Sequence, residues 1–306
     1  MEAIKNKNKW AEFKIYLKEK KEIYLMILPF FILFSIFTIL PVVMSIILGF
    51  TDFNGVKVNN FVFFDNYINL LVDDPIFTKA IINTLVLALI TGPLGYLMCF
   101  VFAWLINDLP KYLRAVMTLV FYAPSISGNA YLIWKLVFSS DIYGYANGFL
   151  KKLGIISEPI YFLTDSDYII WILILVQLWL SLGTSFLAFV AGLKTCDKTL
   201  YEAGSIDGIK NRWQELWYIT LPQMKPQLLF GAVMQITSAF SIGNLSIELF
   251  GFPTVDYAGH TIVTHLYDYG NVKFELGYSS AIATILFFTM IISNLLVQKL
   301  IRKVGK

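Results

Sequence analysis

The sequence predicts an all-α integral membrane protein with six transmembrane helices and both termini in the cytoplasm. Of the 306 residues, 57% are hydrophobic and 15% are charged, whereas soluble proteins carry about 25% charged residues. Six apolar runs are each long enough to cross a bilayer, for which about 20 residues suffice. The Lys and Arg residues gather on one side of these runs, which indicates the side that faces the cytoplasm.

Residues 1–23 are expected to form a basic cytoplasmic helix. They contain seven lysines, and Trp10, Phe13 and Leu17 recur at helical spacing. This pattern favours an amphipathic helix on an anionic membrane surface. A basic start followed by an apolar run also resembles a signal peptide. The apolar run is too long for one, and no small-residue cleavage site follows it, so we expect an uncleaved first span.

Residues 24–77 are expected to hold the first span, 24–50, and an external segment. Pro29 and Pro41 lie inside this span, so neighbouring helices must accommodate bends. Residues 78–302 form the expected transmembrane core, and 303–306 form a cytoplasmic tail. The five core spans are expected at residues 78–106, 115–138, 168–193, 227–250 and 276–301. Gly92-Pro93 is expected to interrupt the first of these five near its middle.

Charge decides the orientation of the chain. In a six-span protein the N-terminus, 107–114, 194–226 and 298–306 lie on one side of the membrane, and these segments hold 18 of the 24 Lys and Arg residues. Cytoplasmic loops carry such an excess of basic residues. Both termini and the loop between spans four and five are therefore expected in the cytoplasm.

That loop, residues 197–226, does not have the pattern of a flexible connection. Leu200, Ala203 and Ile206 recur at helical spacing. Asp207-Gly208 follows, a dipeptide that can end a helix with a residue at positive φ. The first half of the loop therefore predicts a short amphipathic helix and a tight turn.

A second helix is expected to follow the turn. Asn211, with Gln214 three residues later, resembles a capping box. Trp213, Leu216 and Trp217 are expected on one face of this helix. We call residues 197–226 the knob: a stiff helix–turn–helix with an apolar face at the membrane surface. An interfacial helix pair with no protein partner is the alternative interpretation.

The knob resembles the "EAA loop" of type I ABC-importer permeases, whose pattern is E-A-A/G-x-x-D-G-x(8)-I-T-L-P-x-x-x-P. The matching residues are Glu202, Ala203, Gly204, Asp207, Gly208, Ile219, Thr220, Leu221, Pro222 and Pro226. Gly204 replaces the usual second alanine, and Ile209 replaces the alanine that often follows the glycine. In this family the loop is a coupling helix that sits in a cleft of a separate ATPase subunit. The resemblance assigns ATPase coupling to Glu202, Ala203, Gly204, Asp207 and Gly208.

The expected external segments narrow the resemblance to carbohydrate uptake, similar to maltose-type and glycerol-phosphate-type permeases. The matching positions include Asn66, Tyr67, Asp74, Pro75, Asn147, Gly251, Pro253, Thr261 and Tyr267. The resemblance implies a multi-pass permease of a bacterial cell membrane. It also implies a second, similar permease, two cytoplasmic ATPase subunits that bind ATP and Mg²⁺, and an extracellular solute-binding protein. The implied mechanism is alternating access for a sugar of oligosaccharide size, driven by ATP hydrolysis on the partners.

A candidate sugar path lies in the fifth span, which is polar for a membrane helix. Gln235, Ser238, Ser241 and Asn244 recur every three residues, and we expect them to share one stripe. With Tyr122 and Trp179 at similar depth, this stripe offers hydroxyls, amides and flat aromatic faces to a sugar. Hydrogen bonding between helices is the alternative role for these polar side chains.

Enzymatic chemistry is not predicted for this chain. The sequence contains no G-x-x-x-x-G-K-[ST] phosphate loop, so we expect no cofactor, and ATP hydrolysis is assigned to the partner subunits. His260 and His265 are expected to be ordinary surface or interface histidines rather than metal ligands, because no Cys is near them and they have no paired acidic ligand. Nucleic acid is not an expected partner.

Two other functions remain open: an ion-coupled secondary transporter, which needs ionisable groups at mid-membrane, and a structural subunit without a solute path.

Overall fold

The computed structural model describes residues 20–57, 60–141 and 144–301, and within them the chain is helical and contains no β-sheet. Residues 1–19 of the predicted N-terminal helix and the predicted tail 303–306 lie outside the described residues. Four helical segments are long and apolar enough to cross a membrane, at Lys21–Leu48, Pro75–Asn107, Ser166–Thr195 and Leu276–Ile301. Two bent helix pairs raise the number of candidate spans to as many as six.

The first segment comprises α2 (Lys21–Phe34), the π-helix η1 (Ser35–Ile39) and α3 (Leu40–Leu48). The other long segments are α5 (Pro75–Asn107), α9 with α10 (Ser166–Leu180 and Thr184–Thr195) and α17 (Leu276–Ile301). The bent pairs are α6 with α7 (Lys111–Ile126 and Tyr131–Val137) and α14 with α15 (Lys225–Phe240 and Gly243–Phe250). The short elements are α4 (Asp65–Ile68), η2 (Asn69–Asp73), α8 (Tyr145–Lys152), α11 (Lys198–Ile206), α12 (Arg212–Glu215), η3 (Leu216–Thr220), α13 (Leu221–Gln223), η4 (Val255–Tyr257), α16 (Ile262–Tyr267) and η5 (Asp268–Val272).

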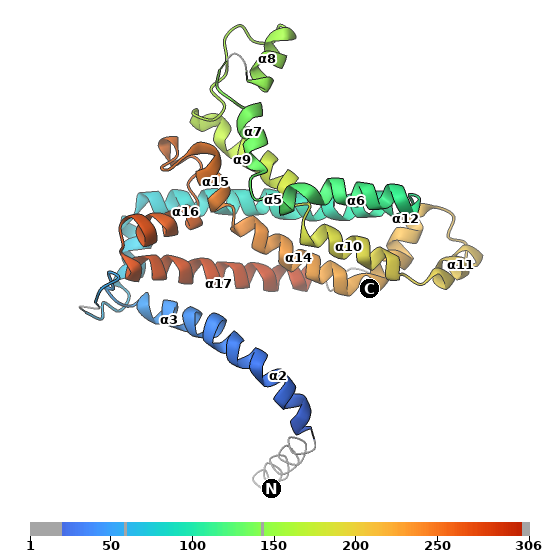
Figure 1. The fold of residues 1–306 in the computed structure, drawn as a ribbon, viewed down its shortest axis with the longest axis horizontal. Coiled ribbons are helices and arrows are strands. Elements are labelled where there is room, and N and C mark those ends of the chain that lie inside the picture. Colours follow the sequence, from blue (N-terminus) through green and yellow to red (C-terminus); the bar gives the residue numbers. More distant parts are fainter. Residues whose placement is uncertain (1–19, 58–59, 142–143, 302–306) are drawn as a thin grey trace.

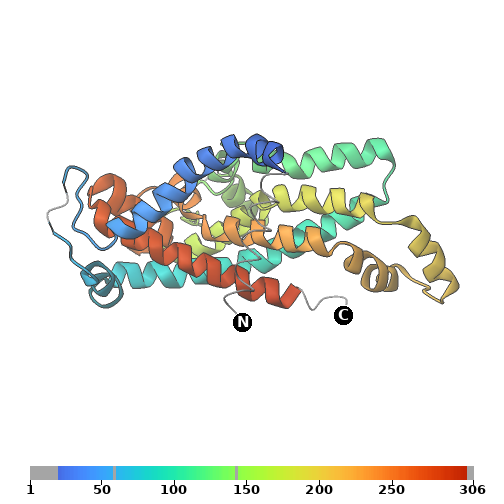
Figure 2. The same cartoon turned by 90° about the horizontal axis from the view of Figure 1, so that it is seen from below.

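The body of the molecule is a bundle in which α5, α6, α10, α14 and α17 run side by side (Figures 1 and 2). The knob, with α11 and α12, lies at one end of this bundle, which we call the knob end. Helix α16 lies at the opposite end, which we call the far end. Helices α7 and α8 project sideways from the bundle, and α2 runs away from it (Figure 1).

Helix α5 is the centre of the bundle, because it packs against α9, α10 and α14. At the knob end its Phe100 joins Phe186 and Phe189 of α10 in one buried cluster. Gly231 of α14 lets the helices approach closely, since an added Cβ there would lie 2.4 Å from Phe189 Cζ. Aromatic side chains inserted against a glycine therefore fix the spacing between α10 and α14.

The prediction that Gly92-Pro93 breaks its span is wrong, and another predicted span has a bend that the sequence analysis did not expect. Gly92-Pro93 does not interrupt its span, since α5 continues through both residues for 33 residues. A proline removes one backbone donor, whereas ending the helix would leave several polar groups unsatisfied inside the bilayer. The span predicted at 115–138 corresponds to the bent pair α6 and α7, which breaks after Ile126: Ser127 is extended (φ −83°, ψ 107°), and α7 lies at 85° to α6.

The first span stands apart from the bundle. Its α3 half packs against α17, yet none of the residues in its most apolar stretch of 18 is buried. The π-helix η1 ends at Ile39, two residues before Pro41, so the helical hydrogen-bond pattern changes to i→i+5 just before this proline. A long apolar helix whose side chains are left unburied needs lipid or another chain around it.

A buried chain of polar side chains ties the far end together. His265 Nε2 lies 3.1 Å from Asp74 Oδ2, and His265 Nδ1 lies 3.1 Å from His260 Nε2. Asp74 also caps α5 by accepting the Phe77 N–H at 2.9 Å. Both histidines are 1% exposed, so the expectation of ordinary histidines without an acidic partner is wrong. The partner could not be seen locally because Asp74 is 191 residues from His265 in sequence.

This cluster should make the far end sensitive to mild acid. Burial lowers the pKa of His260 from 6.5 to about 4, with His265 adding a smaller effect in the same direction. His260 therefore binds a proton more readily when its segment is locally open than when it is closed. The closed state of this segment is fully stabilised above pH 6.5, and that stabilisation is lost as the pH falls towards about 4. We expect deuterium uptake by α16, corrected for intrinsic exchange, to rise as the pH is lowered from 6.5 to about 4.

The control is His260→Gln, which removes one titrating group and should flatten the pH profile. Protection of α16 that stays constant from neutral pH to about pH 4 would contradict the assignment of a neutral, buried histidine pair.

Candidate functional site

The knob is built as the predicted helix–turn–helix, and local hydrogen bonds explain its shape. Asp197 caps α11 by accepting the Thr199 N–H at 2.9 Å. Gly208 follows the helix at φ +94°, which confirms the predicted positive-φ turn. Asn211 accepts the Gln214 N–H at 2.9 Å and so starts α12. Asp197 and Asn211 each satisfy a backbone N–H that a helix start would otherwise leave unpaired, and Gly208 provides the turn that ends α11.

The second helix of the knob continues through a π-turn. The predicted capping box is present with one change, because Gln214 Oε1 accepts the N–H of Lys210 rather than that of Asn211. Helix α12 then passes into η3, where Thr220 donates to the Glu215 carbonyl at 3.2 Å. The segment therefore bends back towards α13 and the start of α14.

The two departures from the EAA pattern lie against each other. Gly204 is buried where α11 meets the second helix, and a Cβ at this position would lie 2.7 Å from Ile219 Cδ1 and 3.0 Å from Ile209 Cδ1. The Ile209 side chain thus fills the space that an alanine methyl at 204 would need. The missing methyl group at position 204 thus makes room for a larger side chain at position 209.

The outward face of the knob has no cover. Leu200 is 46% exposed, Ile206 is 87% exposed and Trp217 is 59% exposed. Glu202, Ala203, Asp207 and Gly208 are also exposed, whereas Gly204 faces inward. The expectation that Trp213, Leu216 and Trp217 share one face is wrong, because Leu216 is 8% exposed and Trp213 is 71% exposed. The π-turn at η3 changes the angular spacing on which that expectation rested.

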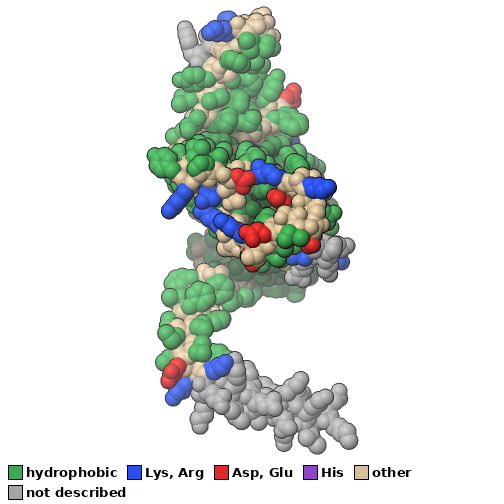
Figure 3. Space-filling view, turned by 90° about the vertical axis from the view of Figure 1, so that its right-hand side faces the viewer, with side chains coloured by type: hydrophobic (Ala, Val, Ile, Leu, Met, Phe, Trp, Pro, Cys, Tyr) green, Lys and Arg blue, Asp and Glu red, His purple; other side chains and the backbone are tan. Residues whose placement is uncertain are grey.

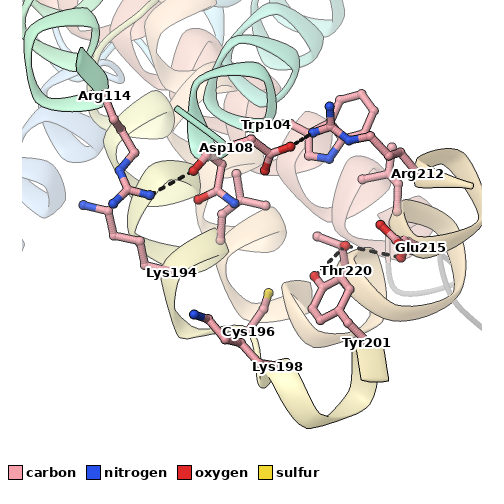
Figure 4. Close-up of a pocket in the computed structure, with 13 residues that line it drawn as sticks. Trp104, Asp108, Arg114, Lys194, Cys196, Lys198, Tyr201, Arg212, Glu215 and Thr220 are labelled. Atoms are coloured by element: carbon pink, nitrogen blue, oxygen red, sulfur yellow. Dashed lines mark hydrogen bonds and ion pairs between the residues drawn. The ribbon is translucent and has the colours of Figure 1, made fainter. Parts of the chain in front are cut away.

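Aromatic and charged contacts clamp the knob to the end of α5 (Figure 4). Arg212 pairs with Asp108 and lies over the Trp104 ring, 5.0 Å from its centroid. The Trp213 ring packs on the same Trp104 ring, with 5.2 Å between the ring centroids. These contacts could not be predicted from the sequence, because Arg212 and Asp108 are 104 positions apart. Opposite charges in two segments expected on the same side were the only available signal.

A second set of contacts holds the knob's two helices together. Tyr201 OH and Thr220 Oγ1 lie 2.8 Å apart, and Gln223 Oε1 accepts the Asp197 N–H at 2.9 Å. These bonds close α11 onto η3 and α13. Figure 3 looks onto the knob end and shows Lys, Arg, Asp and Glu side chains gathered there. The knob is therefore a single packed unit fixed to span ends.

The polar residues of the fifth span do not share one stripe. Gln235 is 4% exposed, with its Oε1 3.5 Å from Ser185 Oγ, and Ser238 accepts from Gln177 Nε2 at 3.0 Å. Ser241 and Asn244 are exposed instead. A step of three residues advances about 300° around an α-helix, so three such steps place the last residue about half a turn from the first. The helix also bends by 43° between α14 and α15.

An exposed polar line does run along α14 and α15, with different members. It comprises Thr237, Ser241, Asn244 and Glu248. Their spacing of four, three and four residues keeps them on one helix face. Ser241 Oγ donates to the Thr237 carbonyl at 2.8 Å, so its hydroxyl oxygen remains available as an acceptor. Polar groups on a membrane helix are expected to face protein or water rather than lipid.

Tyr122 and Trp179 are not brought together. Trp179 lines an apolar cavity of about 720 Å³, where its ring centroid lies 5.6 Å from that of Trp134. Tyr122 is partly buried against the cluster that contains Phe186 and Phe189. Among the described residues, no group of three or more His, Cys, Asp or Glu side chains is placed to hold a metal ion.

Comparisons with known proteins agree on one class. The chain is 30% identical over 276 residues to the lactose transport system permease protein LacF of Rhizobium radiobacter, covering 88% of this chain and 89% of that protein. It is 28% identical over 294 residues to the arabinooligosaccharides transport system permease protein AraP of Bacillus subtilis, covering 94% and 90%. The search against family models found no match.

Solved structures give the same result. A chain of a bacterial ABC transporter involved in the import of the acidic polysaccharide alginate superposes with a TM-score of 0.78 at 25% identity, over 96% of this chain and 100% of that chain. The second structure is that of a bacterial alginate ABC transporter in complex with an alginate pentasaccharide-bound periplasmic protein. It gives a TM-score of 0.77 at 25% identity, over 95% and 97% of the two chains.

The Gly204–Ile209 contact predicts energetic coupling inside the knob. Gly204→Ala alone should destabilise the knob by about 1–3 kcal/mol, because its methyl overlaps Ile219 and Ile209. Adding Ile209→Ala should relieve part of this cost, so the double variant should be at least about 0.5 kcal/mol more stable than the sum of the single effects. Opening free energies from hydrogen exchange of residues 198–220 measure all three variants.

The matched control pairs Gly204→Ala with Ile206→Ala, since Ile206 is 87% exposed and should add independently. Strict additivity for Gly204→Ala with Ile209→Ala would show that the two side chains do not compete for the same space.

Proposed function

The chain belongs to the permease subunits of ABC sugar transporters, and we propose that it forms half of the membrane pathway of a binding-protein-dependent oligosaccharide importer in the bacterial cell membrane. The single observation that carries the proposal is the knob: a packed helix–turn–helix, fixed to the span ends, with an uncovered face. The known transporters to which the chain is similar include lactose, arabinooligosaccharide and alginate systems. The proposed substrate is a sugar of similar size.

The uncovered face of the knob is where we place the ATPase subunit. Leu200, Ile206 and Trp217 offer apolar surface, and Glu202 with Asp207 offers carboxylates beside it. Apolar anchors next to polar groups are typical of specific protein interfaces. ATP and Mg²⁺ then belong to the partner, and this chain converts the partner's closure into movement of its spans.

The exposed first span and the exposed polar line support a second permease. Residues Lys21–Leu48 have no buried side chain in their most apolar window, and Ser241 and Asn244 are uncovered within a span. A second permease would cover the former and complete a water-filled path beside the latter. The binding protein would deliver sugar at the far end.

Ion-coupled transport is less well supported. The Asp, Glu, Lys and Arg residues of the described spans lie near span ends, as Lys79, Glu248 and Lys299 illustrate. A proton or ion relay needs such groups at mid-membrane. The structure offers no specific observation in favour of a purely structural subunit.

The knob is tested with Gly208→Val. A β-branched residue at φ +94° is strained by on the order of 1 kcal/mol or more, and its side chain would project from the uncovered surface. We expect the spans to remain inserted while sugar uptake by the reconstituted complex falls severalfold, through weaker ATPase attachment or through hydrolysis that no longer drives uptake. Glu202→Ala should shift the same readouts in the same direction.

Gly154→Val is the matched control, because Gly154 also has positive φ (+71°) and open space around it but lies away from the knob. Co-purification, ATP hydrolysis and uptake should be normal in this control. Normal attachment and normal uptake in both knob variants would remove the basis for the proposal.

The sugar path is tested by cysteine accessibility in a Cys196→Ser background. Ser241→Cys and Asn244→Cys should react with a hydrophilic thiol reagent, and transported sugar should slow the reaction, because these positions are exposed on the polar line. Ser246→Cys, on the same helix but 0% exposed, should remain inert. Equal inertness at all three positions in every transport state would assign the line to helix packing.

A further inference from the structure

A cavity of about 480 Å³ lies between the knob and the ends of the spans, and its lining includes cations that the clamp does not use (Figure 4). Its walls come from the end of α5, the start of α6, the end of α10 and both helices of the knob. Volumes of this order are typical of small-molecule sites. The cavity therefore touches each of the segments that meet at the knob end.

Cationic side chains dominate this cavity. It is lined by Arg114, Lys194, Lys198 and Arg212, and by only two carboxylates, those of Asp108 and Glu215. Asp108 is already paired with Arg212, which also lies over Trp104. The lining therefore carries a net charge of +2, concentrated on Arg114, Lys194 and Lys198.

These three cations come from different segments and converge. Figure 4 shows Arg114 and Lys194 on one side of the cavity and Lys198 below them, beside Cys196. Arg114 Nη1 donates to the Asn107 carbonyl at 2.9 Å, which orients the guanidinium and leaves further N–H donors unused. No carboxylate of the described residues lies within ion-pair distance of Lys194 or Lys198.

We propose that this cavity is a binding site for a phosphate group, held by Arg114, Lys194 and Lys198. A phosphate monoester carries about −1.5 to −2 charges at neutral pH, which matches the excess charge of the lining. Arginine presents a planar fork suited to phosphate oxygens, and lysine adds point charges. The phosphate belongs either to a soluble phosphorylated metabolite or to the headgroup of an anionic lipid at the membrane surface.

The general excess of cations at the knob end does not account for this arrangement. Positive charge on cytoplasmic loops requires only that basic residues be present. Lys111, Lys210 and Lys299 meet that requirement without lining the cavity. Convergence of three cations on one cavity places like charges near one another, which is unfavourable until an anion joins them.

A native cysteine reports on occupancy. Cys196 lines the cavity and is partly exposed, whereas Cys99 is 0% exposed. We would follow modification of Cys196 by the neutral reagent methyl methanethiosulfonate in the permease purified with its partner subunits, quantified by mass spectrometry of chymotryptic peptides. Glycerol phosphate in detergent tests the soluble source. Nanodiscs with and without phosphatidylglycerol test the lipid source.

We expect saturable, severalfold slowing of Cys196 modification by one of these two sources. Lys194→Gln with Lys198→Gln should weaken that protection on the order of tenfold or more, because charge-assisted hydrogen bonds are lost. Lys111→Gln is the matched control and should leave protection unchanged. Modification does not depend on transport, so this outcome is independent of the coupling role of the knob.

Three results would overturn the proposal: no protection from either source, equal protection by sodium chloride at matched ionic strength, or protection that survives the double lysine substitution. Loss of ATPase attachment in the double variant without any ligand protection would assign the lysines to the subunit interface instead.

Discussion

The clamp between the knob and the end of α5 is the contact on which the proposed mechanism depends, because in that mechanism a partner ATPase would move the spans only through a knob that is fixed to them. The Arg212–Asp108 pair is half-exposed on both sides, so it contributes at most about 1 kcal/mol. Trp213 on Trp104 adds about 0.5–1.5 kcal/mol, and Arg212 over the same ring adds a similar amount. Several modest contacts thus hold one element, and the internal Tyr201–Thr220 bond keeps that element from opening.

The bilayer imposes the second constraint. Since lipid offers no hydrogen bonds, α5 remains helical through Pro93. For the same reason, polar side chains of the spans either form hydrogen bonds between helices or stay exposed for contact with water or another protein. Gln177, Ser185, Gln235 and Ser238 follow the first course, at the packed contact of α9, α10 and α14. Thr237, Ser241, Asn244 and Glu248 follow the second course. The bent pair α14 and α15 therefore carries a packing face and a separate polar face, and the polar face continues across the bend.

Features set by neighbouring residues could be predicted from the sequence. The helical segments, the turn at Gly208 and the Asn211 cap depend on hydropathy and on local hydrogen bonds. Features set by residues far apart in sequence could not, and these include the Arg212–Asp108 clamp and the Asp74–His265 pair. The polar stripe is a different case, because steps of three residues rotate around a helix and the spacing itself argued against a shared face.

The most direct test of the account is the distance between the knob and the ends of the spans during the transport cycle. Spin labels on cysteines at positions 210 and 112, in a Cys196→Ser background, report this distance by pulsed electron paramagnetic resonance; both native residues are exposed. The account predicts the same narrow distance distribution with and without ATP in a complex that transports sugar, because the knob moves with the span ends as one body. A distribution that shifts or broadens with ATP, while transport continues, would contradict it.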